Sequence, residues 1–328
     1  MKIRHYEEYL SNRYGLEIYK EMEGDVESGS LVDRSTGDCI PIEGGIPRFS
    51  DQENYAHNFG LQWNIHRSTQ LDSHTGLTIS ADRLWRGTGW DAGQLRGKRV
   101  LEAGSGAGRF TEILAKAGAN VITFDYSNAI DANSKNTSSF GDIFYFQGDI
   151  YDIPFPDNYF DYVLCYGVLQ HTPDPEGAYE AIWSKVVPGG QLAFDFYRRS
   201  MFPTPWNSKY LWRPLTSRID SELLYKIVKA YVPIYLPVHT ALLKIPMIGK
   251  LLVSLIPIPC FNYVGLGLNR GQRTEWAIMD TFDALSPKYD SPRSREEVIR
   301  MIETDDVERY EVKYGGNGIE ALVTKKSC

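Results

Sequence analysis

Between Lys98 and Arg199 the sequence alternates between short apolar runs and longer helical stretches, and this rhythm limits the fold more than any other feature. We predict helices over residues 107–117, 127–138 and 177–187, and strands over residues 99–103, 120–125, 143–149, 160–167 and 191–197. Strands that are apolar along nearly their whole length are typical of parallel sheets covered on both faces. The sequence therefore predicts a doubly wound α/β core with a Rossmann-like sheet.

Smaller elements are expected on both sides of this core. Residues 29–50 place two β-prone runs around the turn residues 35–38, which indicates a hairpin, and a second hairpin signal surrounds residues 315–318 near the end of the chain. Aromatic residues four positions apart predict one face of a helix: Tyr55, Phe59 and Trp63. We expect residues 1–85 to form a hairpin and helical cover, and residues 86–199 and 291–328 to form the core.

Charge and cysteine content narrow the classes of partner. The 328 residues include 35 Lys and Arg against 42 Asp and Glu, so the net charge is −7 and no overall attraction for nucleic acid is expected. A small cation or a basic partner suits this charge better. The four cysteines lie far apart, and the first residues lack the apolar run of a secretory signal, so we expect a reducing compartment, the cytoplasm.

Residues 200–290 interrupt the rhythm of the core with a tract rich in leucine and proline. Its longest uncharged run, residues 251–269, contains two prolines and two glycines, whereas a membrane-spanning helix needs about 20 mainly apolar residues. No spanning segment is therefore expected. Because the tract leaves the core after the fifth strand, at the edge where ligands bind, we predict a helical lid over an acceptor site. A homodimer surface and a peripheral membrane contact are the alternatives.

A glycine-rich segment follows directly after the first predicted strand, in Glu102-Ala103-Gly104-Ser105-Gly106-Ala107-Gly108. Glycines allow a tight turn and a close approach of the backbone to a ligand. A nicotinamide fingerprint would require a third glycine at position 109, where this chain has Arg109. The nicotinamide interpretation is therefore weakened.

Acidic residues at the ends of three predicted strands refine the choice of ligand. Asp125 ends the second strand, where a carboxylate can accept hydrogen bonds from both ribose hydroxyls. Glu102 and Asp149 add negative charge to a pocket that would have to hold the pyrophosphate of a dinucleotide. A ligand with a ribose, an adenine amine and a positive charge fits such an acidic pocket better.

With these residues the chain resembles the class I S-adenosylmethionine-dependent methyltransferases. The resemblance rests on VLEAGSGAGRF, VITFD, GDI and FDYVLCYGVLQHTPDP, and it covers about residues 98–199 and 292–326. Within the family, GVLQHTPDP is most similar to the branch of quinone-biosynthesis and small-molecule enzymes. The resemblance implies a seven-stranded sheet with an antiparallel last strand, S-adenosylmethionine as cofactor, and methyl transfer to a hydroxyl, amine or carboxyl of a small-molecule acceptor.

The resemblance also implies a set of cofactor contacts. Glu102, Gly104 and Gly106 would approach the methionine part, Asp125 the ribose, Asp149 and Ile150 the adenine, and Tyr166 and Gln170 the sulfonium, with Ser105 and Tyr126 as further contacts. Trp63 either covers the cofactor or packs its helix on the sheet. The segments IPRF, FGLQW and QLDSHTG resemble the front part of a bacterial subset of these enzymes. Related front modules hold zinc through cysteine pairs, but only Cys39 remains here, so no metal is expected.

His171 follows the fourth strand, near the expected position of the acceptor, where it could take a proton from an oxygen or nitrogen nucleophile. The alternative is that it only orders the loop. Tyr197, Asp280, Asp283 and Tyr289 are the expected acceptor contacts, with helix capping and solvation as the plainer interpretation. A nicotinamide-dependent oxidoreductase and a non-catalytic S-adenosylmethionine-binding protein remain as alternative functions.

Overall fold

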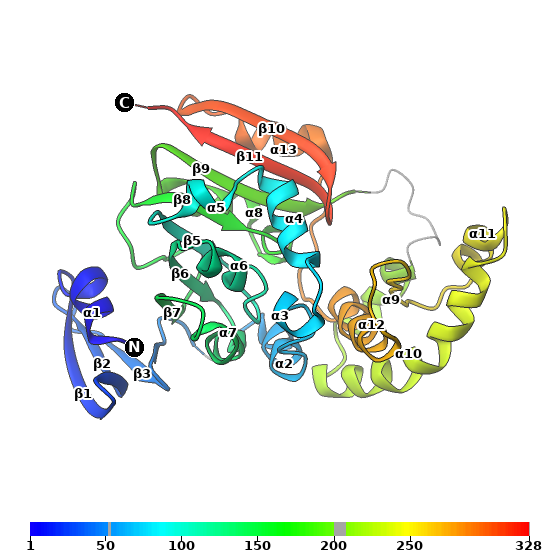
Figure 1. Ribbon diagram of the computed structural model, residues 1–328, viewed down its shortest axis with the longest axis horizontal. Helices are drawn as coiled ribbons and strands as arrows, with labels where there is room; N and C mark the ends of the chain where they lie inside the picture. The colour runs from blue at the N-terminus through cyan, green and yellow to red at the C-terminus, as the bar shows by residue number, and fades with distance from the viewer. Residues whose placement is uncertain (52–53, 200–207, 328) are drawn as a thin grey trace.

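The computed structural model describes residues 1–51, 54–199 and 208–327, and its core is a seven-stranded sheet in the order β10-β11-β9-β8-β5-β6-β7 (Figure 1). Five neighbouring strands are parallel: β5 (Arg99–Ala103), β6 (Asn120–Asp125), β7 (Ile143–Gln147), β8 (Phe160–Cys165) and β9 (Val186–Tyr197). The terminal hairpin joins β10 (Val307–Gly315) to β11 (Gly318–Lys325), and β11 pairs antiparallel with β9. The predicted α/β fold with an antiparallel last strand is confirmed.

Helices cover both faces of this sheet because successive strand residues point to opposite sides. Val100 packs with the face that carries α4 (Ile79–Thr88), α5 (Ala92–Leu95) and α6 (Thr111–Lys116). Leu101 packs with the opposite face, which carries α8 (Pro175–Ser184) and α13 (Arg295–Ile302). Helix α7 (Ala129–Thr137) packs beside α6, and the boundary expected at residue 85 falls inside α4.

The N-terminal residues form a second sheet of four strands, β1 (Tyr14–Met22), β2 (Asp25–Asp33), β3 (Cys39–Glu43) and β4 (Ile46–Pro47), after the short helices α1 (Ile3–His5) and η1 (Tyr6–Leu10). The predicted hairpin corresponds to β2 and β3, which pair antiparallel. Strand β1 was not predicted, because most of its side chains are exposed and its sequence has no apolar pattern. The module attaches to the edge strand β7, where the Phe49 amide donates to the Gln147 carbonyl at 2.8 Å. The Arg48 guanidinium also donates to the Asp131 carboxylate at 2.7 Å.

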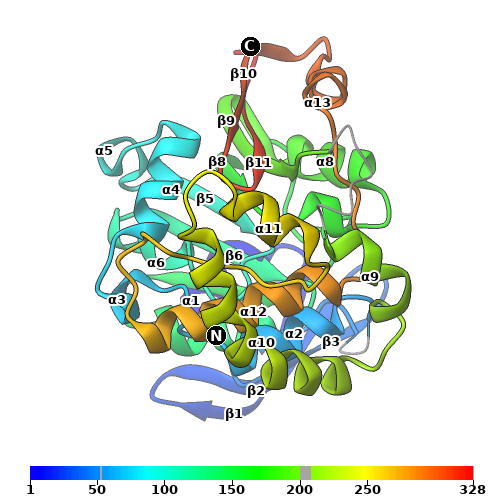
Figure 2. The ribbon, with the colours of Figure 1, turned by 90° about the vertical axis from the view of Figure 1, so that its right-hand side faces the viewer.

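The insertion after β9 is helical in its described part and contains α9 (Ser208–Thr216), α10 (Ser221–Leu243), α11 (Gly249–Leu255) and α12 (Arg270–Leu285). Leu224, Val228 and Val232 of α10 bury themselves against Phe282 of α12, so the insertion has a core of its own. Helix α12 also contacts α2 (His57–Ile65), which is followed by the short α3 (Asp72–Thr75). Figure 2 shows these helices in front of the sheet, and residues 200–207 of the predicted lid lie outside the described residues.

Candidate active site

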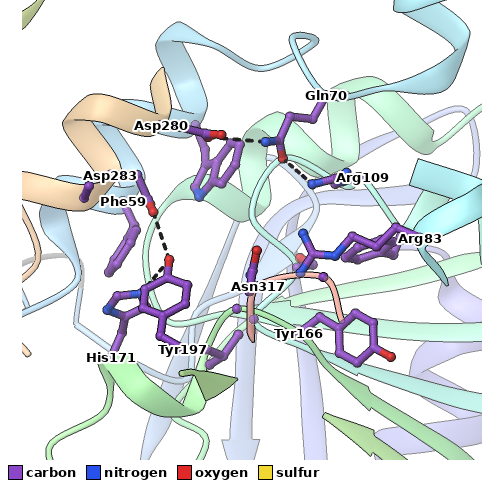
Figure 3. Close-up of a pocket in the computed structure, with 18 of the residues that line it drawn as sticks. Phe59, Gln70, Arg83, Arg109, Tyr166, His171, Tyr197, Asp280, Asp283 and Asn317 are labelled. Carbon is purple, nitrogen blue, oxygen red and sulfur yellow. Dashed lines mark hydrogen bonds between the residues drawn. The ribbon is translucent and has the colours of Figure 1, made fainter. Parts of the chain in front are cut away.

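A cavity of about 760 Å³ lies at the carboxyl ends of the parallel strands, beneath the insertion. Gly104, Asp125, Tyr166 and Tyr197 line it from segments at the ends of β5, β6, β8 and β9. Helix α12 lines it from the other side, and Figure 3 shows residues of both sides facing one space. The topology of an open parallel sheet places ligands at this edge.

The glycine loop between β5 and α6 requires glycine at three positions, because Gly104, Gly106 and Gly108 all have positive φ and little room for a Cβ. Gly104 has φ +74°, and a Cβ there would lie 2.3 Å from the Val168 side chain. Gly106 has φ +54°, and a Cβ there would lie 3.0 Å from the indole of Trp63. Trp63 therefore lies directly over the loop. Trp63, Tyr55 and Phe59 all line the cavity. Helix α2 begins only at His57, so Tyr55 precedes the helix in which it was expected.

Asp125 lies at the cavity wall with a buried carboxylate that already accepts three hydrogen bonds. Its Oδ1 accepts from the Ser127 amide at 2.9 Å and the Ser127 hydroxyl at 2.7 Å, and its Oδ2 accepts from the Gly106 amide at 2.9 Å. A carboxylate offers about four acceptor positions. One position on Oδ2 therefore remains for a ribose hydroxyl, and a second would require the Ser127 hydroxyl to turn away. Burial raises the pKa of Asp125.

Glu102 does not line the cavity, although the resemblance implied a contact with the methionine part. Its Oε2 accepts hydrogen bonds from the hydroxyls of Thr111 and Thr123 inside the core, and only 2% of the residue is exposed. Burial raises the pKa of Glu102 to about 7. In this structure Glu102 holds the first turn of α6 against β5 and β6.

The raised pKa of Glu102 makes a prediction about stability. The unfolded chain ionises this carboxyl near pH 4.5 and the folded chain only near pH 7, so the stabilisation present below pH 4.5 is lost as the pH rises through 7. Glu102→Gln keeps an acceptor for both threonines and does not ionise. We expect its melting temperature to exceed that of the wild type by a few degrees at pH 8 and to match it at pH 4.5, measured by calorimetry. The exposed Glu7→Gln should show no such pH dependence, and an equal difference at both pH values would contradict the assignment.

Other expected cofactor residues divide into two groups. Ser105, Tyr126 and Tyr166 line the cavity, and the buried Tyr166 hydroxyl has no hydrogen-bond partner among the described residues. Gly106, Asp149, Ile150 and Gln170 do not appear in its wall. Asp149 accepts from the Tyr151 amide at 3.1 Å, and Ile150 packs into the core.

His171 lies in the short 3₁₀ helix η2 (Leu169–His171), with its ring orientation set by a backbone carbonyl. Nδ1 lies 2.9 Å from the carbonyl oxygen of Tyr289, and because a carbonyl only accepts, Nδ1 must donate. In the neutral ring Nε2 then carries the free lone pair. It lies 3.4 Å from the Tyr197 hydroxyl, which is 3.3 Å from Asp283 Oδ2 (Figure 3).

The surroundings of His171 favour the neutral, basic form of the imidazole. Burial lowers the pKa of His171. The imidazole packs against the ring of Phe59, with 5.2 Å between the two ring centroids. The expected acceptor residues Tyr197 and Asp283 thus join His171 in one cluster on the cavity wall. Tyr289 contributes its backbone carbonyl, while its own ring packs edge-on against Tyr55.

A second cluster, which the sequence analysis missed, surrounds Arg109. Its Nε donates to the Ser80 hydroxyl at 2.9 Å and its Nη1 to Gln70 at 3.2 Å, and Gln70 donates to Asp280 at 3.4 Å. Asp280 also accepts hydrogen bonds from Tyr263 and Trp276. Burial raises the pKa of Asp280 to about 7 and lowers that of Arg109 to about 9. Asp280 therefore lines the cavity, as expected. Gln70 links its carboxylate to the guanidinium of Arg109.

A third cluster contains a nearly buried ion pair, in which Arg83 Nη2 lies 2.7 Å from Asp195 Oδ2. Arg83 reaches the cavity from α4, and Asn317 reaches it from the tip of the β10–β11 hairpin. Glu320 lies beside Arg83, and burial raises its pKa. Arg83 belongs to no motif, and Asn317 was detectable only as a turn residue of the predicted hairpin.

The sheet order and the glycine loop define a Rossmann-like α/β fold, and the cavity lined by Asp125 and His171 lies at the edge where such sheets bind ligands. A family model described as a methyltransferase domain matches residues 101–194.

Known proteins resemble parts of this chain. The ubiquinone/menaquinone biosynthesis C-methyltransferase of Vibrio cholerae is 30% identical over 119 residues, which is 34% of this chain and 45% of that protein. The ubiquinone biosynthesis O-methyltransferase of Coxiella burnetii is 34% identical over 108 residues, 32% of this chain and 46% of that protein. The chain thus spans about half the length of the curated relatives it matches. A solved structure of a putative S-adenosylmethionine-dependent methyltransferase from Methanococcus maripaludis is 16% identical, with a TM-score of 0.46 over 85% of this chain and 97% of that chain.

Proposed function

We propose that this chain transfers a methyl group from S-adenosylmethionine to a hydroxyl, amine or carboxyl of a small molecule. The observation that carries the proposal is that the glycine loop, Asp125 and His171 line one cavity. The matched methyltransferase domain and the quinone-biosynthesis relatives support it.

The cavity residues fit the chemistry of the cofactor. Asp125 offers an acceptor for a ribose hydroxyl, and Gly104, Ser105 and Trp63 line the cavity beside it. A sulfonium is a cation, which carboxylates and aromatic faces favour; Asp125, Asp283, Trp63 and Tyr166 supply both kinds of group. Arg109, at the end of the glycine loop, and Arg83 provide cationic donors suited to a carboxylate.

S-adenosylmethionine would supply an electrophilic methyl group, so little further chemistry is required of the protein. Its contribution is to hold the two reactants in line and to exclude water. His171 Nε2 would take the proton of a hydroxyl or amine acceptor held near Tyr197 and Asp283. We further propose that the insertion is a lid, because Phe261, Tyr263 and Trp276 line the cavity from above.

The nicotinamide alternative receives less support. Arg109 stands where the third glycine of a nicotinamide fingerprint would be. We also propose that the N-terminal module is the front part of the bacterial subset it resembles, and that the enzyme acts in the cytoplasm.

Titration calorimetry of the full chain tests this proposal. S-adenosylmethionine and S-adenosylhomocysteine should bind with micromolar dissociation constants, whereas NAD and NADP should give no heat. Mass spectrometry of mixtures with hydroxyl, amine and carboxyl acceptors should then reveal a product heavier by one methyl group. Binding of NAD in preference to S-adenosylmethionine would overturn the proposal, and cofactor binding without any product from such a panel would favour the non-catalytic alternative.

A further inference from the structure

The insertion presents an apolar face to solvent on α10. Its inward residues pack against α12, yet the opposite side also carries apolar residues at helical spacing: Leu223, Ile227, Ile234 and Val238, with exposures of 52%, 46%, 75% and 51%. A helix that is apolar on all sides is normally buried in a core or in contact with a membrane. Within the described residues, nothing covers this side.

Exposed apolar residues continue along the chain past the end of α10 and through α11. This stretch exposes Ile245, Met247, Ile248, Leu251, Leu255 and Ile258. We call these six residues and the four on α10 the apolar surface. Helix α11 lies at the end of the molecule remote from the N-terminal sheet, where it projects from the body (Figure 1), and Figure 2 shows α10 and α11 on one face. Contiguous exposed apolar patches of this kind mark interaction sites.

The charge of this segment is opposite to that of the chain as a whole. Residues 223–269 contain four lysines and no aspartate or glutamate, in a chain with net charge −7. Lys244 and Lys250 flank the turn into α11, both exposed, and no carboxylate pairs with either among the residues described. The segment therefore combines an apolar face with unpaired positive charge.

We propose that the apolar surface docks on the surface of an anionic lipid bilayer. Apolar side chains would enter the boundary of the acyl chains while Lys244 and Lys250 lie among the lipid phosphates, as in interfacial amphipathic helices. Contact is with one leaflet only: among the described residues no helix is long and apolar enough to cross a bilayer. A symmetric dimer through this surface would bring the lysines of two copies together without a compensating acid.

The position of the cavity agrees with this orientation. Phe261, Tyr263 and Leu266 follow the apolar surface in the chain and line the cavity. Phe261 and Leu266 are themselves 41% and 40% exposed. An acceptor dissolved in the bilayer would therefore meet the cavity without crossing water, a consequence that rests on the proposed function; the docking itself does not.

Vesicle sedimentation with the full chain tests the docking. Vesicles of phosphatidylcholine with phosphatidylglycerol should bind the protein, vesicles of phosphatidylcholine alone should bind it more weakly, and high salt should weaken binding to the anionic vesicles. Met247→Glu with Leu251→Glu should reduce binding at least tenfold. Lys244→Gln with Lys250→Gln should reduce it by about 30-fold on anionic vesicles, from about 1 kcal/mol for each lysine at the membrane surface.

The matched control places two glutamates on an exposed strand of the N-terminal sheet, Ile18→Glu with Met22→Glu, at residues that are 42% and 59% exposed. Its binding should equal that of the wild type. Calorimetric titration with S-adenosylmethionine separates this proposal from the previous one, because every variant should keep the cofactor affinity of the wild type, whatever that is. The proposal is wrong if the wild type ignores anionic vesicles, or if all variants bind them equally. A wild-type dimer that Met247→Glu with Leu251→Glu makes monomeric, without vesicle binding, would overturn it in favour of a self-interface.

Discussion

His171→Ala should lower kcat by about 10²- to 10⁴-fold when the acceptor is a hydroxyl or an amine, the range typical of a positioned general base. The reason is the free lone pair on Nε2, which results because Nδ1 donates to the Tyr289 carbonyl. Since burial lowers the pKa of His171, the wild-type rate should hold from neutral pH down to below 6.5 and fall as the imidazole becomes protonated. The alanine variant should lack this limb, and its rate should rise with pH if the acceptor ionises unaided. The measurement is a pH–rate profile with the acceptor found by mass spectrometry.

A second substitution separates proton transfer from loop ordering. His171→Asn retains an N–H group that can donate to the Tyr289 carbonyl but has no basic nitrogen. It should be as slow as His171→Ala while binding S-adenosylmethionine normally. The exposed His57→Ala on α2 is the control and should be fully active. An asparagine variant with the wild-type kcat would show that His171 only orders the loop.

Asp125→Ala should weaken binding of S-adenosylmethionine by about 10- to 150-fold, because a hydrogen bond to a charged group contributes about 1.5–3 kcal/mol. The carboxylate offers its remaining acceptor position to the ribose and also holds the Gly106 amide of the glycine loop. Titration calorimetry with S-adenosylmethionine and with S-adenosylhomocysteine measures the loss. Both ligands should lose affinity equally, because they share the ribose.

The control for this substitution is Asp161→Ala. Asp161 lies near the amino ends of the parallel strands, on the side of the sheet away from the cavity, where its carboxylate accepts a hydrogen bond from the Arg99 amide at 2.9 Å. The Asp161→Ala substitution should lower the stability of the fold without changing the affinity for S-adenosylmethionine. Asp125→Asn serves as a second variant in case the alanine variant unfolds, and unchanged affinity in a folded Asp125 variant would remove Asp125 from the cofactor site.

Much of the core could be predicted from the sequence because it depends on local patterns. Continuous apolar runs specify strands buried on both faces, and the turn residues at 315–318 specify the last hairpin. The glycine loop was also detectable, since Gly104 and Gly106 adopt positive φ that other residues rarely tolerate. The location of Asp125 and Tyr166 at the cavity follows from the same parallel topology, because both residues occur at the carboxyl ends of strands.

What the local patterns could not reveal is which side chains converge on the cavity. Glu102 and Asp125 both occur near the ends of neighbouring strands, yet packing turns Glu102 toward Thr111 and Thr123 and leaves Asp125 at the cavity wall. The Tyr289 carbonyl that sets the tautomer of His171 is 118 positions away in the chain.

The clusters around Arg83 and Arg109 also result from tertiary packing. Their residues come from α4, α12, the glycine loop, the hairpin and the segments beside α3, which share no periodicity in the sequence. Hydrophobic period and turn chemistry act over a few residues and determined the elements of this protein. Only the packing of those elements brought charges far apart in the sequence into one buried volume, where desolvation changes their pKa values and fixes their partners.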